Sequence, residues 1–288
     1  KFVKIDFSEI RLQKHIKPVL LSACIIFLSS IYNKIDVTML NVMGTNEAVG
    51  YYSYAQKTVN MVLTMANAVT VALLPRLSYY YDYDKKNFYR LIDKGSQVLA
   101  FMTFPLAGGM VLVSAQAVEL LYGKAFAATA LTIQLMCPLI LIKGFGDLFC
   151  YQLVYSTKSE KIILPAATAA SMINIIANAI LIPRLLQDGA VIASVLSEMI
   201  TNAIQFVYMK RKVKFNINKK ALFDGVFSTL IMALSVIAVK QINLQNTISL
   251  ILEVLCGAIV YTVVNLLVRN SLTFEIIEKV KSYYIHKK

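Results

Sequence analysis

Seven of the charged residues within long apolar stretches of this sequence, where charges are rare, are candidates for a functional role. They are three lysines and four carboxylates: Lys34, Asp36, Lys57, Lys143, Asp147, Glu198 and Glu253. A charge at membrane depth is costly, so it usually faces protein or water instead of lipid. Lysine can attract an anionic group there, and a buried carboxylate can carry a proton or contact a substrate. These seven residues are therefore the candidates for lining a transport cavity.

The spacing of the first three predicts two different roles near one side of the membrane. Lys34 and Asp36 differ by about 200° around a helix, so they cannot pair with each other. Lys57 follows early in the next apolar stretch, and we expect it to pair with Asp36. Lys34 would then face the cavity and stay free for an anionic group. The alternative is that both lysines extend to the lipid headgroups.

The other four candidates lie farther along the chain. Lys143 and Asp147 are four residues apart and share a helix face, so they can form an ion pair, which is either structural or in contact with substrate. Glu198 lies near the middle of its apolar stretch. Its carboxylate is either held by hydrogen bonds or carries a proton or contacts substrate. The same alternatives hold for Glu253.

Metal binding and covalent catalysis find no support in the residue pattern. The four cysteines lie inside apolar runs, without a CxxC pair or a nearby histidine, so we expect no disulfide, no metal site and no cofactor. The two histidines, His15 and His286, lie in the terminal segments, with no acidic cluster beside them. An embedded enzyme would need a nucleophile, base or metal group, so we expect none.

The elements that must position these residues are predicted to be transmembrane helices. Of 288 residues, 58% are hydrophobic and 16% charged, against about 25% charged in soluble domains. A transmembrane barrel would show short alternating segments instead. A helix needs about 20 apolar residues to cross a bilayer. Eight runs qualify: 18–40, 53–74, 95–118, 129–155, 162–182, 190–209, 222–239 and 247–268.

The basic residues alternate with these runs. Of 29 lysines and arginines, 23 lie before the first span, in every second connection, or after the last span. Both ends of the chain are therefore predicted to be cytoplasmic. This pattern accounts for most of the +13 net charge without nucleic-acid binding. The predicted divisions are a lead-in amphipathic segment at 1–17, six helices at 18–209, a basic loop at 210–221, two further helices at 222–268 and an amphipathic tail at 269–288.

Two of the predicted spans contain residues that break or bend helices. The third holds Pro105, Gly108 and Gly109, and the fourth holds Pro138, Gly144 and Gly146. Proline removes a helix hydrogen bond, and glycine relaxes the backbone. Such breaks occur at the moving helices of transporters and also in ordinary kinked helices. These six residues are the hinge candidates.

Three stretches of the chain resemble the Wzx-type polysaccharide flippases. The stretch 174–198, NIIANAILIPRLLQDGAVIASVLSE, is similar to that family's pattern N-x3-N-x2-LIP, a short glycine-containing loop, then Gly-Ala-Ala-Ile-Ala-Thr and a Ser-Glu. Six residues match its second part: Gly189, Ala190, Ile192, Ala193, Ser197 and Glu198. The stretch 35–61 resembles the family's Asp-x2-Met-Leu followed by Val-Gly-x-Tyr-x2-Ala, and ELLYGKAF at 119–126 fits as well. The second Gly-Ala of the loop is missing here. The three matches follow the family's order along the chain.

The resemblance implies an all-α integral membrane protein of the multidrug/oligosaccharidyl-lipid/polysaccharide exporter superfamily. The eight helices would form one six-helix lobe of a MATE-like fold plus two additional C-terminal helices. The start at Lys1 suggests a fragment whose N-terminal lobe is missing. The implied activity is moving an undecaprenyl-diphosphate-linked oligosaccharide across a bacterial cytoplasmic membrane by alternating access. Lys34, Lys57 and Lys143 would supply positive charge to the cavity, with H⁺ or Na⁺ as a possible coupling cation and membrane lipids as surroundings.

Several rival functions remain open at this stage. A drug or cation antiporter of the same superfamily would rely on the buried carboxylates. A flippase for a peptidoglycan precursor is closer still. A membrane-embedded glycan-modifying enzyme and a scaffold for synthesis machinery belong to other classes and fit less well. Transport of a lipid-linked glycan in proteoliposomes would separate these classes.

Overall fold

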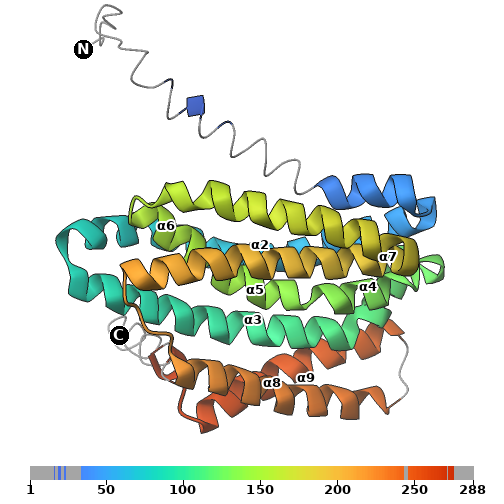
Figure 1. The fold of residues 1–288 in the computed structure, drawn as a ribbon. Helices are drawn as coiled ribbons and strands as arrows, with labels where there is room; N and C mark the ends of the chain where they lie inside the picture. The colour runs from blue at the N-terminus through green and yellow to red at the C-terminus, as the bar shows by residue number, and fades with distance from the viewer. Residues whose placement is uncertain are drawn as a thin grey trace, which may run out of the picture.

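The computed structural model describes residues 16, 19, 20, 23, 34–242, 246–270 and 272–275. Every regular element within these ranges is helical, which confirms the all-α prediction (Figure 1). The longer helices are α2 (Asn46–Tyr83), α3 (Lys85–Tyr122), α7 (Ile163–Lys212), α8 (Lys219–Lys240) and α9 (Asn246–Leu267). Shorter ones fill the middle of the chain: η2 (Lys124–Phe126), α4 (Thr129–Met136), α5 (Pro138–Gly146), the π-helical η3 (Asp147–Gln152), α6 (Leu153–Ser156) and η4 (Glu160–Ile162).

Three of the long helices begin at a residue that caps them with its side chain. Thr45 accepts a hydrogen bond from the Ala48 amide at the start of α2. Asp84 and Asn218 do the same for α3 and α8. Such caps satisfy one of the free amides of the first turn. Because the backbone amide of Asn87 donates to it, the pKa of Asp84 lies below its usual value.

Six helical stretches of the described residues are long and apolar enough to cross a membrane, so the expected count of eight is not confirmed. Two of the expected spans, 162–182 and 190–209, lie within α7. A straight helix of its 50 residues would reach about 75 Å, more than twice the bilayer core. Leu186 interrupts it with φ 49° and ψ −127°, and the two arms lie side by side as a hairpin (Figure 1). The expected span 18–40 lies largely outside the described residues.

The close contact of the two α7 arms depends on a glycine. A Cβ atom on Gly189 would lie 2.5 Å from the carbonyl oxygen of Leu181. Any side chain at this position would therefore push the arms apart near the bend. The conformation of Leu186, rare for a residue with a side chain, marks the same turn.

The fourth span is divided, and the third is not. Pro138 begins α5 after a turn at Cys137, and a π-helical segment follows Gly146. By contrast, α3 runs without a break through Pro105, Gly108 and Gly109. A Cβ on Gly108 would lie 2.5 Å from Thr229 of α8, so this glycine allows close helix packing. The hinge roles of all six proline and glycine candidates stay predictions.

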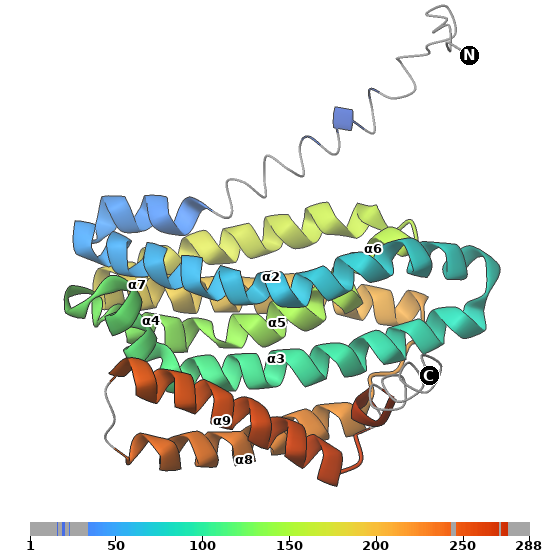
Figure 2. The same ribbon diagram turned by 180° about the vertical axis from the view of Figure 1, so that it is seen from behind.

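The bundle is elongated, and its connections fall at two opposite ends (Figures 1 and 2). The basic connections α2–α3, α6–α7 and α7–α8 lie at one end. There Lys158 pairs with Asp82 at 3.0 Å, which raises the pKa of Lys158, and the Lys212 ammonium donates to the Thr157 carbonyl at 2.8 Å. The bend of α7 and the α3–α4 connection lie at the other end. The structure thus gathers these basic segments on one side of the bundle.

Apolar packing holds the bundle together in two clusters along its length. The cluster toward the α7 bend contains Tyr52, Leu63 and Ile140, and the one toward the basic end contains Phe88, Phe149 and Phe215. The α8–α9 pair packs on α3 below these clusters (Figure 2). The predicted chain divisions 1–17, 18–209, 210–221, 222–268 and 269–288 stay predictions, and the first and most of the last fall outside the described residues.

Candidate functional site

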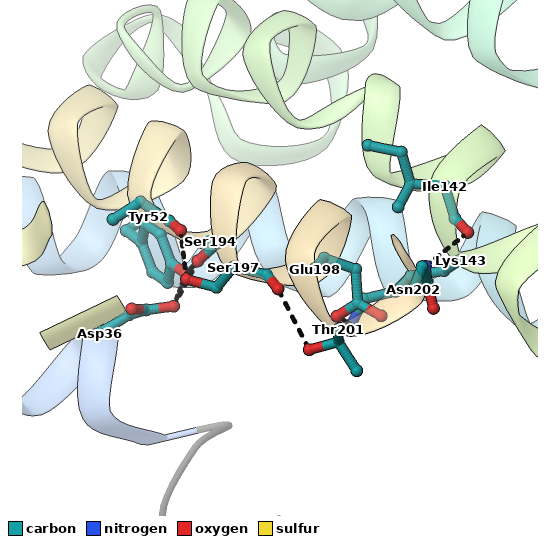
Figure 3. A network of polar contacts seen from close by, with 10 residues as sticks. Asp36, Tyr52, Ile142, Lys143, Ser194, Ser197, Glu198, Thr201 and Asn202 are labelled. Carbon is teal, nitrogen blue, oxygen red and sulfur yellow. Dashed lines mark hydrogen bonds and ion pairs between the residues drawn. The ribbon is translucent and has the colours of Figure 1, made fainter. Parts of the chain in front are cut away.

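Asp36 is buried at the centre of a hydrogen-bonded network that joins three helices. Its side chain lies in the helical residues 34–43 and is 5% exposed. One carboxylate oxygen accepts from the amides of Asn174 at 2.9 Å and Asn178 at 2.7 Å. The other accepts from the Tyr52 hydroxyl at 2.8 Å and from the Ser194 hydroxyl (Figure 3). Four neutral donors therefore stabilise this carboxylate.

The expected ion pair between Asp36 and Lys57 is wrong. Lys57 is exposed on α2 and makes no ion pair with the described residues, and Asp36 is satisfied by the four neutral donors. Sequence spacing placed the two residues at one end of the bundle. It could not show that the Asn174 and Asn178 amides of α7 hydrogen-bond to Asp36 in place of Lys57. Lys34 is exposed as well.

Lys143 pairs with Glu198 instead of Asp147. The distance from its ammonium nitrogen to the Glu198 carboxylate is 3.7 Å, and the two side chains are 32% and 18% exposed. Asp147 lies one ordinary helical turn after Lys143, and its amide donates to the Lys143 carbonyl, but its carboxylate makes no ion pair with Lys143. The partner of Lys143 therefore comes from the second arm of α7. Asn202, one turn beyond Glu198, donates to the carbonyl of Ile142 at 3.0 Å (Figure 3).

A small polar pocket connects these two groups. Its volume is about 40 Å³, and Asp36, Ser194, Lys143 and Glu198 contribute to its wall together with Gln56 and Asn60 of α2. Figure 3 shows Ser194 of the second α7 arm beside Asp36 of the 34–43 segment, and Glu198 farther along the same arm. Space of this size suits a water molecule or a small cation. Two carboxylates and one ammonium group thus face the same interior space.

The groups around Asp36 include oxygen atoms that a small hard cation could use. The Ser194 hydroxyl lies against the carboxylate, whereas the Asn174 and Asn178 amides face it with their N–H groups and would have to rotate to present their oxygens. The Asn178 side-chain oxygen is buried without a hydrogen-bond partner. Carboxylate, carbonyl and hydroxyl oxygens are the ligands that hard cations prefer. Within the described ranges, no cluster of three or more His, Cys, Asp or Glu residues is present.

A stripe of polar residues on α2 escaped the sequence predictions. Ser53, Lys57, Asn60, Thr64 and Asn67 are all exposed, and their spacing keeps them within about 80° of the helix surface. Polar side chains in the middle of an apolar helix face protein or water instead of lipid. We name these five residues the α2 polar stripe. These polar residues alternate at intervals of four and three residues along the sequence, and that helical spacing could have predicted the stripe.

Glu253 lies apart from the polar pocket. It is fully buried in α9, where Gln116 donates to it at 2.6 Å and Ser249 at 2.8 Å. The Lys240 ammonium of α8 lies 3.8 Å from its other carboxylate oxygen. Glu253 also lies at an apolar groove of about 420 Å³ between α2, α3, α8 and α9. The structure therefore separates Glu253 from Asp36, Lys143 and Glu198.

Comparison with known proteins gives consistent matches. A family model described as Lipid II flippase MurJ matches residues 3–257. Two curated proteins of Haloferax volcanii are similar: Probable flippase AglR, 24% identical over 80% of this chain, and Probable low-salt glycan biosynthesis flippase Agl15, 21% identical over 82%. The matched regions make up 49% and 50% of those proteins, so the chain spans about half their length.

A solved structure has a similar fold. The Lipid II flippase MurJ in an inward closed conformation matches 93% of this chain with a TM-score of 0.76 and 19% identity, over 57% of its own length. These matches support the flippase superfamily expected from the sequence. They do not confirm the Wzx-type branch or the MATE-like description.

Proposed function

Because the chain belongs to the MurJ family of lipid II flippases, whose model matches residues 3–257, we propose that it moves a lipid-linked saccharide across a membrane by alternating access. The observation that carries the proposal is the polar pocket between Asp36 and the Lys143–Glu198 pair, continued by the α2 polar stripe. Such groups are costly inside an apolar bundle unless they face a water-filled path. A flippase breaks no bond, so these residues bind and position instead of catalysing.

Positive charge on the cavity wall suits the diphosphate of a lipid carrier. Lys57 lies in the α2 polar stripe, and Lys34 is exposed on the neighbouring helical segment. Neither ammonium group is paired with a carboxylate of the described residues. We propose that both contact the anionic headgroup. Lys143 is already paired with Glu198 and would contribute less free charge.

Coupling to a cation is proposed at Asp36. Its carboxylate and the Ser194 hydroxyl would hold Na⁺, together with the amide oxygens of Asn174 and Asn178 once these side chains rotate from their present N–H contacts with Asp36. Alternatively, Asp36 would carry a proton. A bound cation would stabilise the contacts between the 34–43 segment and both arms of α7. Asp147, Glu198 and Glu253 are weaker candidates, since Glu198 and Glu253 face lysines and Asp147 lies outside the pocket lining.

Two substrate classes fit this site. An undecaprenyl-diphosphate-linked oligosaccharide is the first proposal, because both curated relatives are named as flippases and one of them as a glycan biosynthesis flippase. A peptidoglycan precursor fits equally well, because the family model carries the name of a lipid II flippase. Both share a lipid diphosphate and a saccharide. A drug or cation antiporter would not need the exposed lysines.

The proposed setting is a bacterial cytoplasmic membrane with the basic end of the bundle on the cytoplasmic side. The basic connections gathered at that end support this orientation. The α2 polar stripe would face a second, N-terminal lobe of the same protein across the cavity. This arrangement explains why a polar helix face is left exposed.

The test is flipping in proteoliposomes that contain the full-length protein. Fluorescent lipid-linked oligosaccharide and lipid II are supplied separately, and a membrane-impermeant quencher measures how much of each changes leaflet. We expect one of the two to move, and Lys57→Ala to slow it at least tenfold. Lys124→Ala is the matched control, because Lys124 is highly exposed in the α3–α4 connection. Movement of neither lipid, or equal rates in both variants, would contradict the proposal.

A further inference from the structure

A second group of buried oxygen atoms lies where α8 begins and α9 ends. The side chains of Asp224, Ser228, Tyr261 and Asn265 are all less than 6% exposed. The Ser228 and Tyr261 hydroxyls and the Asn265 amide oxygen have no hydrogen-bond partner among the described residues. Such polar atoms are rare in folded proteins, and a bound ion or water is one explanation for them. None of these residues lies in the polar pocket of Asp36.

The register of the two helices places these atoms at the same level. A Cβ on Gly257 of α9 would lie 3.2 Å from Val236 and 3.5 Å from Met232 of α8. Since the helices run antiparallel, Ser228 lies one turn further, level with Tyr261, and Asp224 lies level with Asn265. The Asn265 amide nitrogen donates to the backbone carbonyl of Tyr261 at 2.9 Å, one turn earlier on α9. The two antiparallel helices thus place four buried, oxygen-bearing side chains on adjacent turns of the face that they share.

No lysine or arginine of the described residues balances the charge of Asp224. Among the same residues, the Asn270 amide donates to its carboxylate at 3.2 Å. A buried carboxylate that keeps its charge needs a positive partner or several donors. Within the described ranges, four donors reach Asp36 and one reaches Asp224.

We propose that Asp224, Ser228, Tyr261 and Asn265 bind one monovalent alkali cation, Na⁺ or K⁺. The donor set consists of a carboxylate, an amide oxygen and two hydroxyls, which are hard oxygen ligands. The single negative charge selects a monovalent over a divalent ion, because the latter would leave an uncompensated positive charge in a buried place. The Thr273 hydroxyl, buried and also without a partner, is a further ligand candidate from the segment after α9.

The cation would fasten the α8–α9 pair to the rest of the bundle at its basic end. Asn270 joins the segment after α9 to Asp224, and Glu275 of that segment pairs with Lys94 of α3. Asn218, the capping residue of α8, donates to Asp93 of α3 at 3.1 Å. One ion bound at Asp224 would therefore stabilise the packing of α8, of the segment after α9 and of α3 together. This site is independent of the proposed transport function.

The test is thermal unfolding of the purified full-length protein in NaCl, KCl or choline chloride at equal ionic strength. We expect a saturable rise of about 5 °C in Tm with Na⁺ or K⁺ relative to choline. The comparison is made with Asp36→Asn present, so that binding near Asp36 does not contribute. In that background Asp224→Asn should abolish the rise, and Ser228→Ala should shift its midpoint to at least threefold higher ion concentration. Asp188→Asn is the matched control, because Asp188 lies near the α7 bend and accepts from Thr132. It should keep the full response.

If Asp224→Asn does not fold, ion binding can be measured instead by the fluorescence of a tryptophan placed near the proposed site. The chain contains no tryptophan, and the ring centroid of Phe101 lies 5.3 Å from that of Tyr261. Tryptophan introduced as Phe101→Trp should change its emission on addition of Na⁺ or K⁺ but not of choline. The measurement is made with Asp36→Asn present, so that binding near Asp36 cannot produce the signal. Identical emission in all three salts, or an unchanged Tm response in Asp224→Asn, would overturn the proposal.

Discussion

Replacing Asp36 by alanine should destabilise the protein strongly. The change removes the acceptor of four hydrogen bonds, from Tyr52, Asn174, Asn178 and Ser194. The donors would then be left without their partner in a site that is 5% exposed at Asp36. The side chains of Asn174 and Asn178 are fully buried, so they cannot turn to solvent.

The size of the effect follows from these contacts. A hydrogen bond to a charged group contributes about 1.5–3 kcal/mol, so four would add up to more than most single substitutions cost. In the variant, water that enters the adjoining pocket can replace some of the lost hydrogen bonds. We therefore expect the free energy of unfolding to fall by about 3–5 kcal/mol, as for a broken buried charge network. This corresponds to a fall of about 10 °C in Tm. Asp36→Asn keeps the shape and one acceptor, and should lose about half as much.

Thermal unfolding in detergent, followed by the loss of the monodisperse peak in size-exclusion chromatography, measures this change. Lys34→Ala is the control from the same helical segment, because Lys34 is exposed and its loss should change stability by less than about 0.5 kcal/mol. If Asp36→Ala unfolds within about 2 °C of the unchanged protein, the carboxylate does not organise these helices and the argument fails.

Three further predictions concern other parts of the molecule. In a variant without native cysteines, an impermeant thiol reagent added from outside should label a cysteine at Asn46 but not one at Asn218; equal labelling would refute the proposed orientation. The double variant Lys143→Glu/Glu198→Lys should be about 1–2 kcal/mol more stable than the sum of the two single changes predicts, because the ion pair is partly buried and its charged atoms lie 3.7 Å apart. A double-mutant cycle in Tm measures this coupling, and zero coupling would mean that the pair does not contribute to stability. The folded-state pKa of Asp84 lies below its ordinary value of 3.8. The stability that its carboxylate contributes should therefore be present above pH 3.8 and lost as the pH falls through the lowered pKa. Asp84→Ala should thus lower Tm more at pH 7 than at a pH below the lowered pKa, and a pH-independent difference in Tm would contradict the capping role.

The sequence alone determined the class of the protein and the end of the bundle to which each connection belongs. Long uncharged runs require helices in a bilayer, because only there are all backbone groups satisfied within one segment. The alternation of basic connections predicted which ones share an end, and the structure brings those connections together. The charged candidates were visible in the apolar runs without any coordinates, and their roles at a transport cavity stay predictions.

Only the tertiary structure decided which of these charges meet. Spacing along one helix predicted Lys143 with Asp147, but the returning arm of α7 gave Lys143 the partner Glu198. Proximity of ends predicted Asp36 with Lys57, but two asparagines of α7 reach Asp36 instead. A helix period fixes neighbours within about one turn. Partners on other helices depend on how the helices pack. The apolar runs 162–182 and 190–209 predicted a connection between them, but only the structure shows that the bend at Leu186 brings the two arms of α7 side by side.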